Sequence, residues 1–387
     1  MDDQYDATSD DRFSFGLWTV GHRGQDPFGL PTRPPIEPEE ITARLAEVGA
    51  WGVCMHDDDL VPFGSKSAER DRIVARFADA VRNAGLTVSM ATVNLFSQPV
   101  FRDGALTAAD PAVRRFALRK TVAAIDTGAE LGAPVFVLWG GREGVESGAA
   151  RDPRVALERY REGVEFLCEY VRAQGLEIHF ALEAKPNEPR GHIHLPTTGH
   201  MLHFIETLSH PEMVGVNPEM AHESMAGLSF SAAVGQALWA GKLFHVDLNS
   251  QNGPRFDQDF RFGAEDIKEA FLTVRLLERS GYSGARHFDA RAYRTEDDGD
   301  VYQAFARGCI RNYKILAAKA AAFDADPAIR EACVRAGAAQ LDEPTPVFSS
   351  EVLDAIRAED FAALLASREG RHHEHADQLM VELIFGA

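Results

Sequence analysis

The sequence alternates short apolar runs with longer helical patterns eight times. The predicted strands are Phe13–Leu17, Gly52–Met55, Thr87–Ala91, Val135–Leu138, Ile178–Leu182, Val214–Val216, Leu243–Val246 and Ala285–Phe288. Helical patterns follow them near residues 39–49, 66–84, 111–131, 153–174, 198–208, 231–241, 264–280 and 300–320. Asp110 before Pro111 and Asp152 before Pro153 are typical helix starts. Eight consecutive βα units favour an α/β fold of the closed (β/α)8, or TIM-barrel, type over an open sheet.

Three segments are predicted. Residues 1–11 are polar and acidic and form an N-terminal tail, and residues 12–321 form the (β/α)8 barrel. Residues 322–387 are rich in helical patterns, contain no further strand, and are broken by Pro344 and Pro346. This C-terminal helical extension is too short and too weakly apolar for an independent domain. We expect an arm that packs on a neighbouring subunit; the alternative is an arm that folds back on its own barrel.

The overall charge limits the partners of the chain. Its 387 residues carry a formal net charge of −19, which disfavours binding to nucleic acid or to an anionic membrane. The sequence has no signal peptide and no apolar run near 18 residues, so no membrane span is expected. Its four cysteines form no CxxC pair, which indicates a reducing compartment, and we expect the cytoplasm.

Four carboxylates close four of the predicted strands. They are Glu183, Glu219, Asp247 and Asp289. In a parallel barrel the carboxyl ends of all strands lie at one rim, so these side chains converge there. Each close pair of negative charges would repel by about 4 kcal/mol at an effective dielectric of 20. Positive charge is therefore required at the rim, and a divalent metal ion is the first hypothesis.

A second set of candidate ligands lies beside the first. Glu219 and His222 form a Glu-x-x-His spacing just past a strand, and Asp257 and Asp259 follow the seventh predicted strand. Glu219 can belong to both sets. Ligands that are nearly all oxygen suit Mg2+, Mn2+ or Co2+. A single Asp-x-Asp is more often a solvated loop, and a single acidic residue often caps a helix, but their combination at one rim favours metal.

Other residues at the same rim are candidates for acid–base chemistry and for substrate contacts. His56 is followed by three aspartates, an arrangement typical of a tuned acid–base group, although a structural rim histidine is an equal alternative. Thr92 ends the third strand. Aromatic side chains suit the C–H faces of a sugar and exclude water, although each one alone is more often part of the core, except Trp139, which two glycines follow. The candidate wall residues are Trp18, Phe28, Phe96 and Trp139.

Some motifs are set aside or absent. The tract His372–His375 lies in the predicted arm, and we interpret it as a solvated helix face. The sequence contains no P-loop, no G-x-G-x-x-G, no G-x-S-x-G and no H-E-x-x-H. These absences argue against nucleotide, dinucleotide and serine-hydrolase chemistry.

Several motifs resemble the xylose isomerase family, whose members are also used as glucose isomerases. They are Phe15–Gly21, Asp26–Gly29, His56–Leu60, Asn94–Phe96, Leu138–Gly144, Lys185–Gly191, Gly215–Glu219, His245–Asn249 and His287–Asp289. The resemblance is greatest to the shorter, actinobacterial-type branch and covers nearly the whole chain.

The resemblance implies a role for each matching residue. The first metal is expected on Glu183, Glu219, Asp247 and Asp289, and the second on Glu219, His222, Asp257 and Asp259. His56 and Asp59 would assist ring opening, and Lys185 would contact the carbonyl end of the open sugar. Trp18, Phe96 and Trp139 would line the pocket. Phe28 matches an aromatic residue that is lent by a neighbouring subunit, so a homotetramer is expected.

The chain departs from the family pattern at a few positions. His22 stands where tryptophan is usual, Val93 for threonine, Gln98 for histidine and Ala184 for proline. After Asp289 the family continues with phenylalanine, lysine and proline, where this chain has Ala290, Arg291 and Ala292. The changes bear on metal affinity, stability and sugar preference rather than on the type of reaction.

These observations predict a metal-dependent aldose–ketose isomerase. It would interconvert D-xylose and D-xylulose, and D-glucose and D-fructose, by ring opening and a metal-assisted 1,2-hydride shift. Two divalent cations per subunit are expected, with Mg2+ first and Mn2+ or Co2+ as alternatives. The competing hypotheses are another sugar isomerase or a 3-epimerase, a metal-dependent phosphoesterase acting on nucleic acid, and an inactive homologue.

Overall fold

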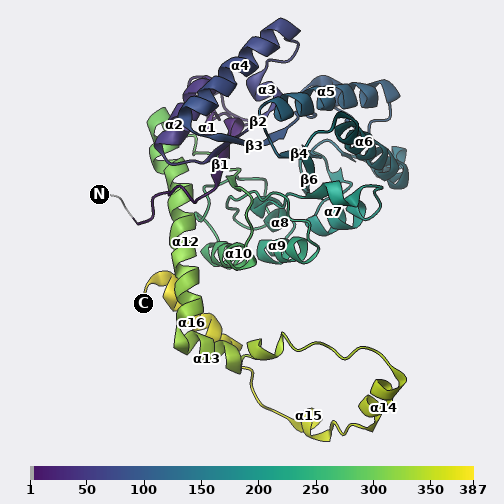
Figure 1. Cartoon of the computed structure of the whole chain (residues 1–387), viewed down its shortest axis with the longest axis vertical. Helices are drawn as coiled ribbons and strands as arrows, with labels where there is room; N and C mark the ends of the chain where they lie inside the picture. The colour runs from purple at the N-terminus through teal and green to yellow at the C-terminus, as the bar shows by residue number, and fades with distance from the viewer. Residues whose placement is uncertain (1–3) are drawn as a thin grey trace. The chain divides into compact units, whose positions relative to one another are not determined.

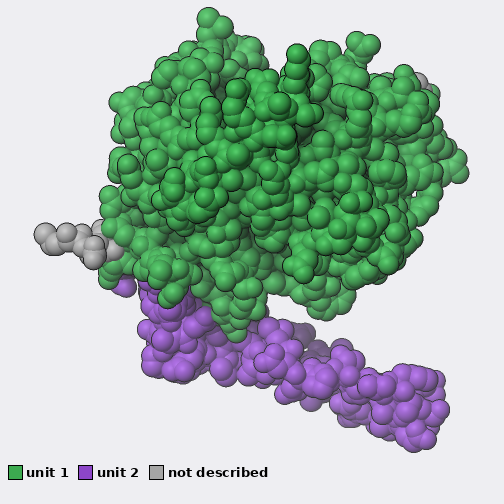
Figure 2. All heavy atoms as spheres, turned by 45° about the horizontal axis from the view of Figure 1, so that its top comes forward, with its two compact units in different colours: residues 1–315 green, residues 316–387 purple. Residues whose placement is uncertain are grey.

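The computed structural model describes residues 4–387, so the first three residues of the predicted acidic tail lie outside it. The chain divides into two compact units, Met1–Ile315 and Leu316–Ala387 (Figure 2). The two units are described separately. This division follows Ile315 and concerns the compactness of the fold. The functional domain boundary predicted after residue 321 stays a prediction.

The first unit is built around parallel strands enclosed by helices (Figure 1). Within residues 4–315, seven strands form one sheet in the order β8-β6-β4-β3-β2-β1-β9. Their bounds are Phe13–Gly16 for β1, Gly52–His56 for β2, Thr87–Thr92 for β3, Val135–Trp139 for β4, His179–Glu183 for β6, Val214–Val216 for β8 and Arg286–Phe288 for β9. Every pairing between neighbours is parallel. These strands agree closely with the predicted ones.

The predicted strand Leu243–Val246 closes the barrel without forming a regular ladder. Leu243 makes an isolated parallel bridge to Val216 of β8, and Asp247, the residue after the segment, makes one to His287 of β9. Gly215 permits the close approach to β8, because a Cβ atom there would lie 2.3 Å from the ring of Phe244. The segment therefore occupies the eighth position between β8 and β9, and the predicted (β/α)8 barrel is confirmed.

Helices cover the outside of the barrel (Figure 1). They are α2 (Pro38–Glu47), α4 (Ser67–Ala84), α5 (Pro111–Glu130), α6 (Pro153–Gln174), α7 (Thr198–Ile205), α9 (Phe230–Trp239) and α10 (Ile267–Ser280). A further helix, α12 (Arg307–Ala325), begins in this unit and continues into the second. Asp110 caps α5 by accepting a hydrogen bond from Ala112 N, and Asp152 caps α6 by accepting one from Arg154 N. Both predicted caps are confirmed, and each satisfies a helix-end N–H group.

Short elements follow the carboxyl ends of the strands. They include α1 (Leu17–Val20), α3 (Asp57–Leu60), α8 (Met220–Met225), α11 (Asp298–Asp300) and the π-helix η4 (Val301–Ala306). Two further short strands, β5 (Gly144–Val145) and β7 (His192–Ile193), pair antiparallel and tie together the loops after β4 and β6. These elements hold the rim loops that carry most candidate site residues.

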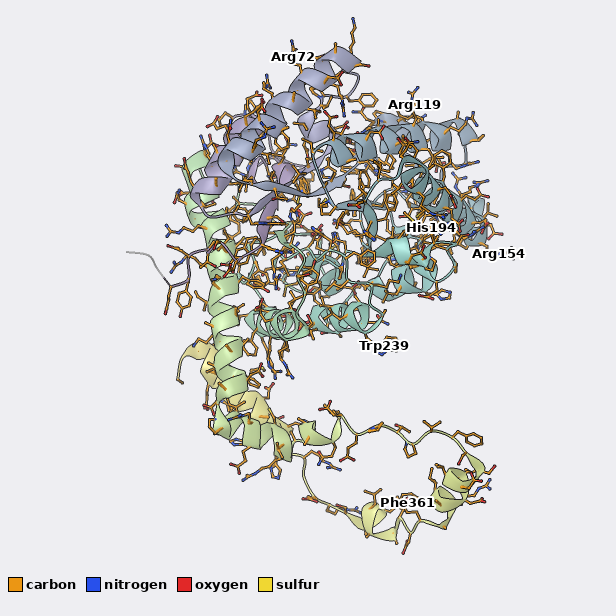
Figure 3. The ribbon with its side chains drawn as sticks, viewed as in Figure 1. Arg72, Arg119, Arg154, His194, Trp239 and Phe361 are labelled. Atoms are coloured by element: carbon orange, nitrogen blue, oxygen red, sulfur yellow. The ribbon has the colours of Figure 1, made fainter. Side chains whose placement is uncertain are left out.

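The second unit is helical. It contains α13 (Pro327–Arg335), α14 (Ser350–Ala358), α15 (Ala362–Ala366) and α16 (His373–Phe385). Helices α13 and α16 contact each other. The tract His372–His375 is exposed, as predicted. Between α13 and α16 several large apolar side chains face solvent, among them Phe361, labelled in Figure 3. Across the described residues of both units, no helix combines the length and apolar character needed to cross a membrane.

Phe288 of β9 anchors an aromatic cluster in the barrel unit. Its ring centroid lies 5.2 Å from that of Phe15 and 5.7 Å from that of Phe13, and the side chain is fully buried. We expect Phe288→Ala to lower the free energy of unfolding by about 3–5 kcal/mol, because it leaves a cavity that rigid neighbours cannot fill. Phe166→Ala on α6, where the ring is half exposed, is the matched control and should cost much less. Chemical unfolding of both variants tests this; equal losses would contradict it.

Candidate active site

The four carboxylates that end predicted strands meet at the carboxyl-terminal end of the barrel. Glu183 ends β6, Glu219 precedes α8, Asp247 lies on the closing segment and Asp289 follows β9. Oxygen atoms of Glu219, Asp247 and Asp289 lie within 4.8 Å of one another. All four side chains line one cavity of about 340 Å3. The convergence expected from the strand ends is therefore present.

The second candidate set lies in the same cavity and shares Glu219. His222 Nδ1 is 3.2 Å from Glu219 Oε2 and 3.5 Å from Glu183 Oε1. His222 Nε2 is 3.3 Å from Asp257 Oδ2. Carboxylate oxygens of Glu219, Asp257 and Asp259 also lie within 4.8 Å of one another. Glu219 thus belongs to three overlapping clusters, each able to offer a cation three ligand atoms.

The electrostatics of this group show a shortage of positive charge. Burial, followed by repulsion from Asp247 and Asp289, raises the pKa of Glu183 well above its ordinary value. Burial and Asp247 raise the pKa of Asp289 to about 7. Burial and Asp257 likewise raise the pKa of Glu219. Without added positive charge, burial and mutual repulsion therefore favour the protonated, neutral forms of these carboxyl groups.

Two cations of the chain itself compensate part of this charge. The Lys185 ammonium contacts Asp257, and the Arg291 guanidinium contacts Asp259. Burial opposes ionisation of Asp257, but its contacts with His222 and Lys185 outweigh burial and hold its pKa well below the ordinary range. Among residues 4–387, no lysine or arginine forms an ion pair of this kind with the other carboxylates of the cavity.

Divalent cations fit this donor set. Among residues 4–387, the buried atoms His222 Nδ1, Asp247 Oδ1 and Asp257 Oδ1 have no hydrogen-bond partner. Buried polar atoms are normally paired, so these three indicate that a ligand belongs among them. Carboxylate oxygens with a single imidazole suit Mg2+ or Mn2+, and the absence of sulfur from the set disfavours a structural zinc site.

His56 and Asp59 form an acid–base pair at the edge of the cavity. His56 Nδ1 donates to Asp59 Oδ2 over 2.9 Å, and the His56 backbone N–H donates to the same oxygen, also over 2.9 Å. Burial lowers the pKa of His56, but the Asp59 carboxylate outweighs burial and the net shift is upward. Because Nδ1 is held by Asp59, Nε2 is the atom of the ring that can exchange a proton with a ligand.

Aromatic rings form a continuous wall beside this pair. The ring centroid of His56 lies 4.4 Å from that of Trp18 and 5.7 Å from that of Phe96, whose own centroid is 4.6 Å from that of Trp139. Trp18 Nε1 donates to Asp289 Oδ1 over 2.9 Å, which ties the wall to the carboxylates. Lys185 Nζ lies 5.6 Å from the Trp139 ring centroid. The cavity therefore has one apolar side and one charged side.

Two further residues were predicted to contact the substrate, Thr92 and Phe28, and only Thr92 lines the cavity of its own chain. Thr92 lines the cavity, although its hydroxyl donates to Val137 O over 2.9 Å and so is already engaged. Phe28 does not line the cavity of its own chain, and its side chain is 99% exposed. The expectation that Phe28 walls the same cavity as the other aromatic residues is wrong for a single chain, because its loop carries the ring into solvent. Its contribution to a neighbouring subunit stays a prediction.

Sequence reasoning passed over several residues that the fold brings to the site. His22, noted only as a departure from the family pattern, lines the cavity. Asn217 and Asn249 hydrogen-bond the carboxylates. The signal for the two asparagines is their spacing, because each lies two positions from a rim carboxylate, and alternate residues of a strand point to the same side.

The fold and the site together define a (β/α)8 barrel whose cavity, at the carboxyl ends of the strands, is lined by carboxylate and histidine groups able to bind cations. The chain belongs to the xylose isomerase-like TIM barrel family, which matches residues 42–307. It is 50% identical over 384 residues to the xylose isomerase of Thermus thermophilus, with 99% of each chain covered. The protein is therefore an enzyme of the xylose isomerase-like superfamily, an isomerase. Its place in the actinobacterial-type branch stays a prediction.

Solved structures share the fold at low sequence identity. A putative xylose isomerase from Rhodospirillum rubrum matches with a TM-score of 0.60 and 17% identity, covering 79% of this chain and 98% of the other. An L-ribulose 3-epimerase matches with a TM-score of 0.59 and 16% identity, covering 82% of this chain and 99% of the other. At these identities the similarity concerns the fold alone.

Cation binding should stabilise the protein measurably. At a hundred times the dissociation constant, Mg2+ should add about 2.7 kcal/mol to the free energy of unfolding and raise the melting temperature. Glu219→Gln removes the carboxylate shared by three clusters. In this variant, Mg2+ should no longer raise the melting temperature. Without metal, the variant should melt at or above the melting temperature of the metal-free wild type, because one repelling charge is gone. Thermal melts with and without Mg2+ measure both effects; an unchanged wild-type melt would contradict the site.

Proposed function

We propose that the chain is a metal-dependent aldose–ketose isomerase that interconverts D-xylose and D-xylulose, with D-glucose and D-fructose as further substrates. One observation carries the proposal. The carboxylate–histidine clusters, the His56–Asp59 pair, Lys185 and the aromatic wall all face a single cavity of about 340 Å3. The 50% identity to a xylose isomerase over nearly the whole chain supports the same reaction.

Two divalent cations per subunit are proposed, with Mg2+ first. Glu183, Glu219, Asp247 and Asp289 would hold the first, and Glu219, His222, Asp257 and Asp259 would hold the second. The unpartnered buried atoms of His222, Asp247 and Asp257 support this assignment. Once bound, such cations polarise sugar oxygens and favour transfer of hydrogen between neighbouring carbons.

His56 would open the cyclic sugar. Its Nδ1 proton stays on the hydrogen bond to Asp59, so Nε2 exchanges a proton with the sugar: the anomeric hydroxyl loses a proton and the ring oxygen gains one. Asp59 orients the imidazole and stabilises its charged form. The upward shift in the pKa of His56 supports this role, because the ring then holds a proton over a wider pH range.

Lys185 would act on the open sugar. In the aldose-to-ketose direction, the hydrogen on C2 moves with its electron pair to C1, while a proton leaves O2 and one is gained at O1. Negative charge grows on O1 during the transfer, and the Lys185 ammonium can stabilise it by donating a hydrogen bond. Trp18, Phe96 and Trp139 would keep water away, because their rings form one side of the cavity.

Association into a homotetramer is proposed, with the helical arm packing on a neighbouring subunit. Residues 341–365 expose several large apolar side chains that a lone chain would leave in water, including Leu341, Val347 and Phe348. Phe28, fully exposed in one chain, would complete the cavity of a partner. The four cysteines, all within the described residues, are free thiols, which supports a cytoplasmic location.

The reaction is tested by measuring xylulose formation from D-xylose by metal-stripped protein. We expect no activity without metal and restored activity on addition of Mg2+ or Mn2+. A panel of ketoses tested in parallel for C3 inversion separates isomerase from 3-epimerase activity. Metal binding without xylulose formation would contradict the proposal and favour an epimerase or an inactive homologue.

Replacement of Asp59 should isolate the ring-opening step. The Asp59→Asn variant loses the carboxylate charge that raises the pKa of His56, whereas the burial that lowers this pKa remains. The pKa of His56 should therefore fall. Activity on cyclic D-xylose should drop about a hundredfold or more, with Mg2+ affinity unchanged. Asp58→Asn is the matched control, because Asp58 contacts Lys120 instead. Histidine resonances followed by NMR against pH, with steady-state rates, measure both effects. Loss of metal binding in Asp59→Asn would contradict this division of roles.

A further inference from the structure

Asn217 links two of the rim carboxylates through its side-chain amide. Its Nδ2 lies 2.7 Å from Asp247 Oδ2 and 3.3 Å from Glu183 Oε2. Its Oδ1 lies 3.0 Å from Nδ1 of His245. Asn217 is 0% exposed and His245 is 1% exposed. The amide therefore has no water to compete for its hydrogen bonds.

The orientation of this amide follows from its partners. A carboxylate accepts hydrogen bonds, so the NH2 group of Asn217 must face Asp247 and Glu183. The amide oxygen must then face His245, and an amide oxygen can only accept. Nδ1 of His245 consequently carries a proton and donates it. The reversed amide would place an oxygen against two carboxylates.

The His245 ring also lies beside the Asp247 carboxylate. Nδ1 is 3.2 Å from Asp247 Oδ1, the oxygen that lacks a hydrogen-bond partner within residues 4–387. Nε2 of His245 is likewise buried without a partner in this part of the chain. The Nδ1 proton of His245 is thus committed to the amide oxygen of Asn217, which fixes the orientation of the amide.

We propose that Asn217, locked in one orientation by His245, is the positioning residue for the first cation. It holds Asp247 and Glu183 at a fixed separation and leaves Asp247 Oδ1 without a hydrogen bond, available to a ligand. The proposal rests on the proposed function, since it concerns the carboxylates assigned there to the first cation. Neither Asn217 nor His245 is itself a ligand in that assignment.

The second set of carboxylates is supported differently, which allows a selective test. Asn249 Nδ2 donates to Glu219 Oε1 over 2.7 Å, and its Oδ1 accepts from the backbone N–H of Ala221 over 2.8 Å. The amide of Asn249 is thus oriented by a backbone N–H group, whereas the amide of Asn217 is oriented by the side chain of His245. Substitution of His245 should therefore affect the first cation and spare the second.

The test is a calorimetric titration of Co2+ into metal-stripped wild type and variants. The wild type should bind in two steps, and Asp257→Asn identifies the step that belongs to the second cation. Asn217→Asp, which keeps the shape but loses the donor, should weaken the first cation about 10–100-fold, as is typical for groups that orient metal ligands. His245→Phe should do the same, and the second step should change less than twofold.

Rescue separates positioning from packing. His245→Asn places an amide N–H near the former Nδ1, so it should restore affinity to within about threefold of the wild type. Asn83→Asp, the same chemical change at an exposed site on α4, should have no effect. Metal-free melting curves confirm that each variant folds.

The outcomes are distinguishable. Equal weakening of both steps, an unchanged first step in Asn217→Asp, or identical behaviour of His245→Asn and His245→Phe would each overturn the inference while leaving the proposed function intact. A wild type that binds no Co2+ would overturn the proposed function, and this inference with it.

Discussion

Repulsion between buried carboxylates is the constraint on which the site depends. Six of them face one cavity: Glu183, Glu219, Asp247, Asp257, Asp259 and Asp289. Burial and mutual repulsion raise the pKa of several members, and among residues 4–387 only Lys185 and Arg291 pair with these carboxylates as a lysine or an arginine. Such a cluster is unfavourable unless cations or protons join it. The surrounding side chains therefore hold these carboxylates in place against their mutual repulsion.

The barrel supplies the rigidity for this arrangement. Parallel strands bring residues far apart in the chain to one rim, and hydrogen bonds from Trp18, Asn217 and Asn249 orient the carboxylates there. Asp259 adopts a left-handed backbone conformation with φ of 47°, which is unusual for a residue other than glycine. Arg291 binds its side chain, and the Arg291 backbone N–H donates to Asp259 O over 2.7 Å. Strain of this kind persists where neighbours over-determine a conformation, as at functional sites.

Most of the barrel could be predicted because its periodicity is local. Runs such as Val135–Leu138 are apolar for their full length, since a parallel strand in a barrel is covered on both faces. The closing segment Leu243–Val246 was predicted as a strand but makes only isolated bridges, because its pairing depends on where β8 and β9 lie. The direction in which the loop of Phe28 projects has no signal in the sequence either, and the ring lies exposed in a single chain.

The sequence by itself determined the eight strand–helix units and the chemistry at the strand ends, because apolar periodicity and residue type are properties of neighbouring residues. Tertiary structure decided which groups meet across the barrel. Lys185 pairs with Asp257, Arg291 with Asp259, and His245 with Asn217, and none of these pairs has a signal in local sequence. Such contacts depend on the closure of the barrel, which sets distances between side chains that lie tens of residues apart. The electrostatic balance of the site is therefore a property of the fold, although every charge in it is visible in the sequence.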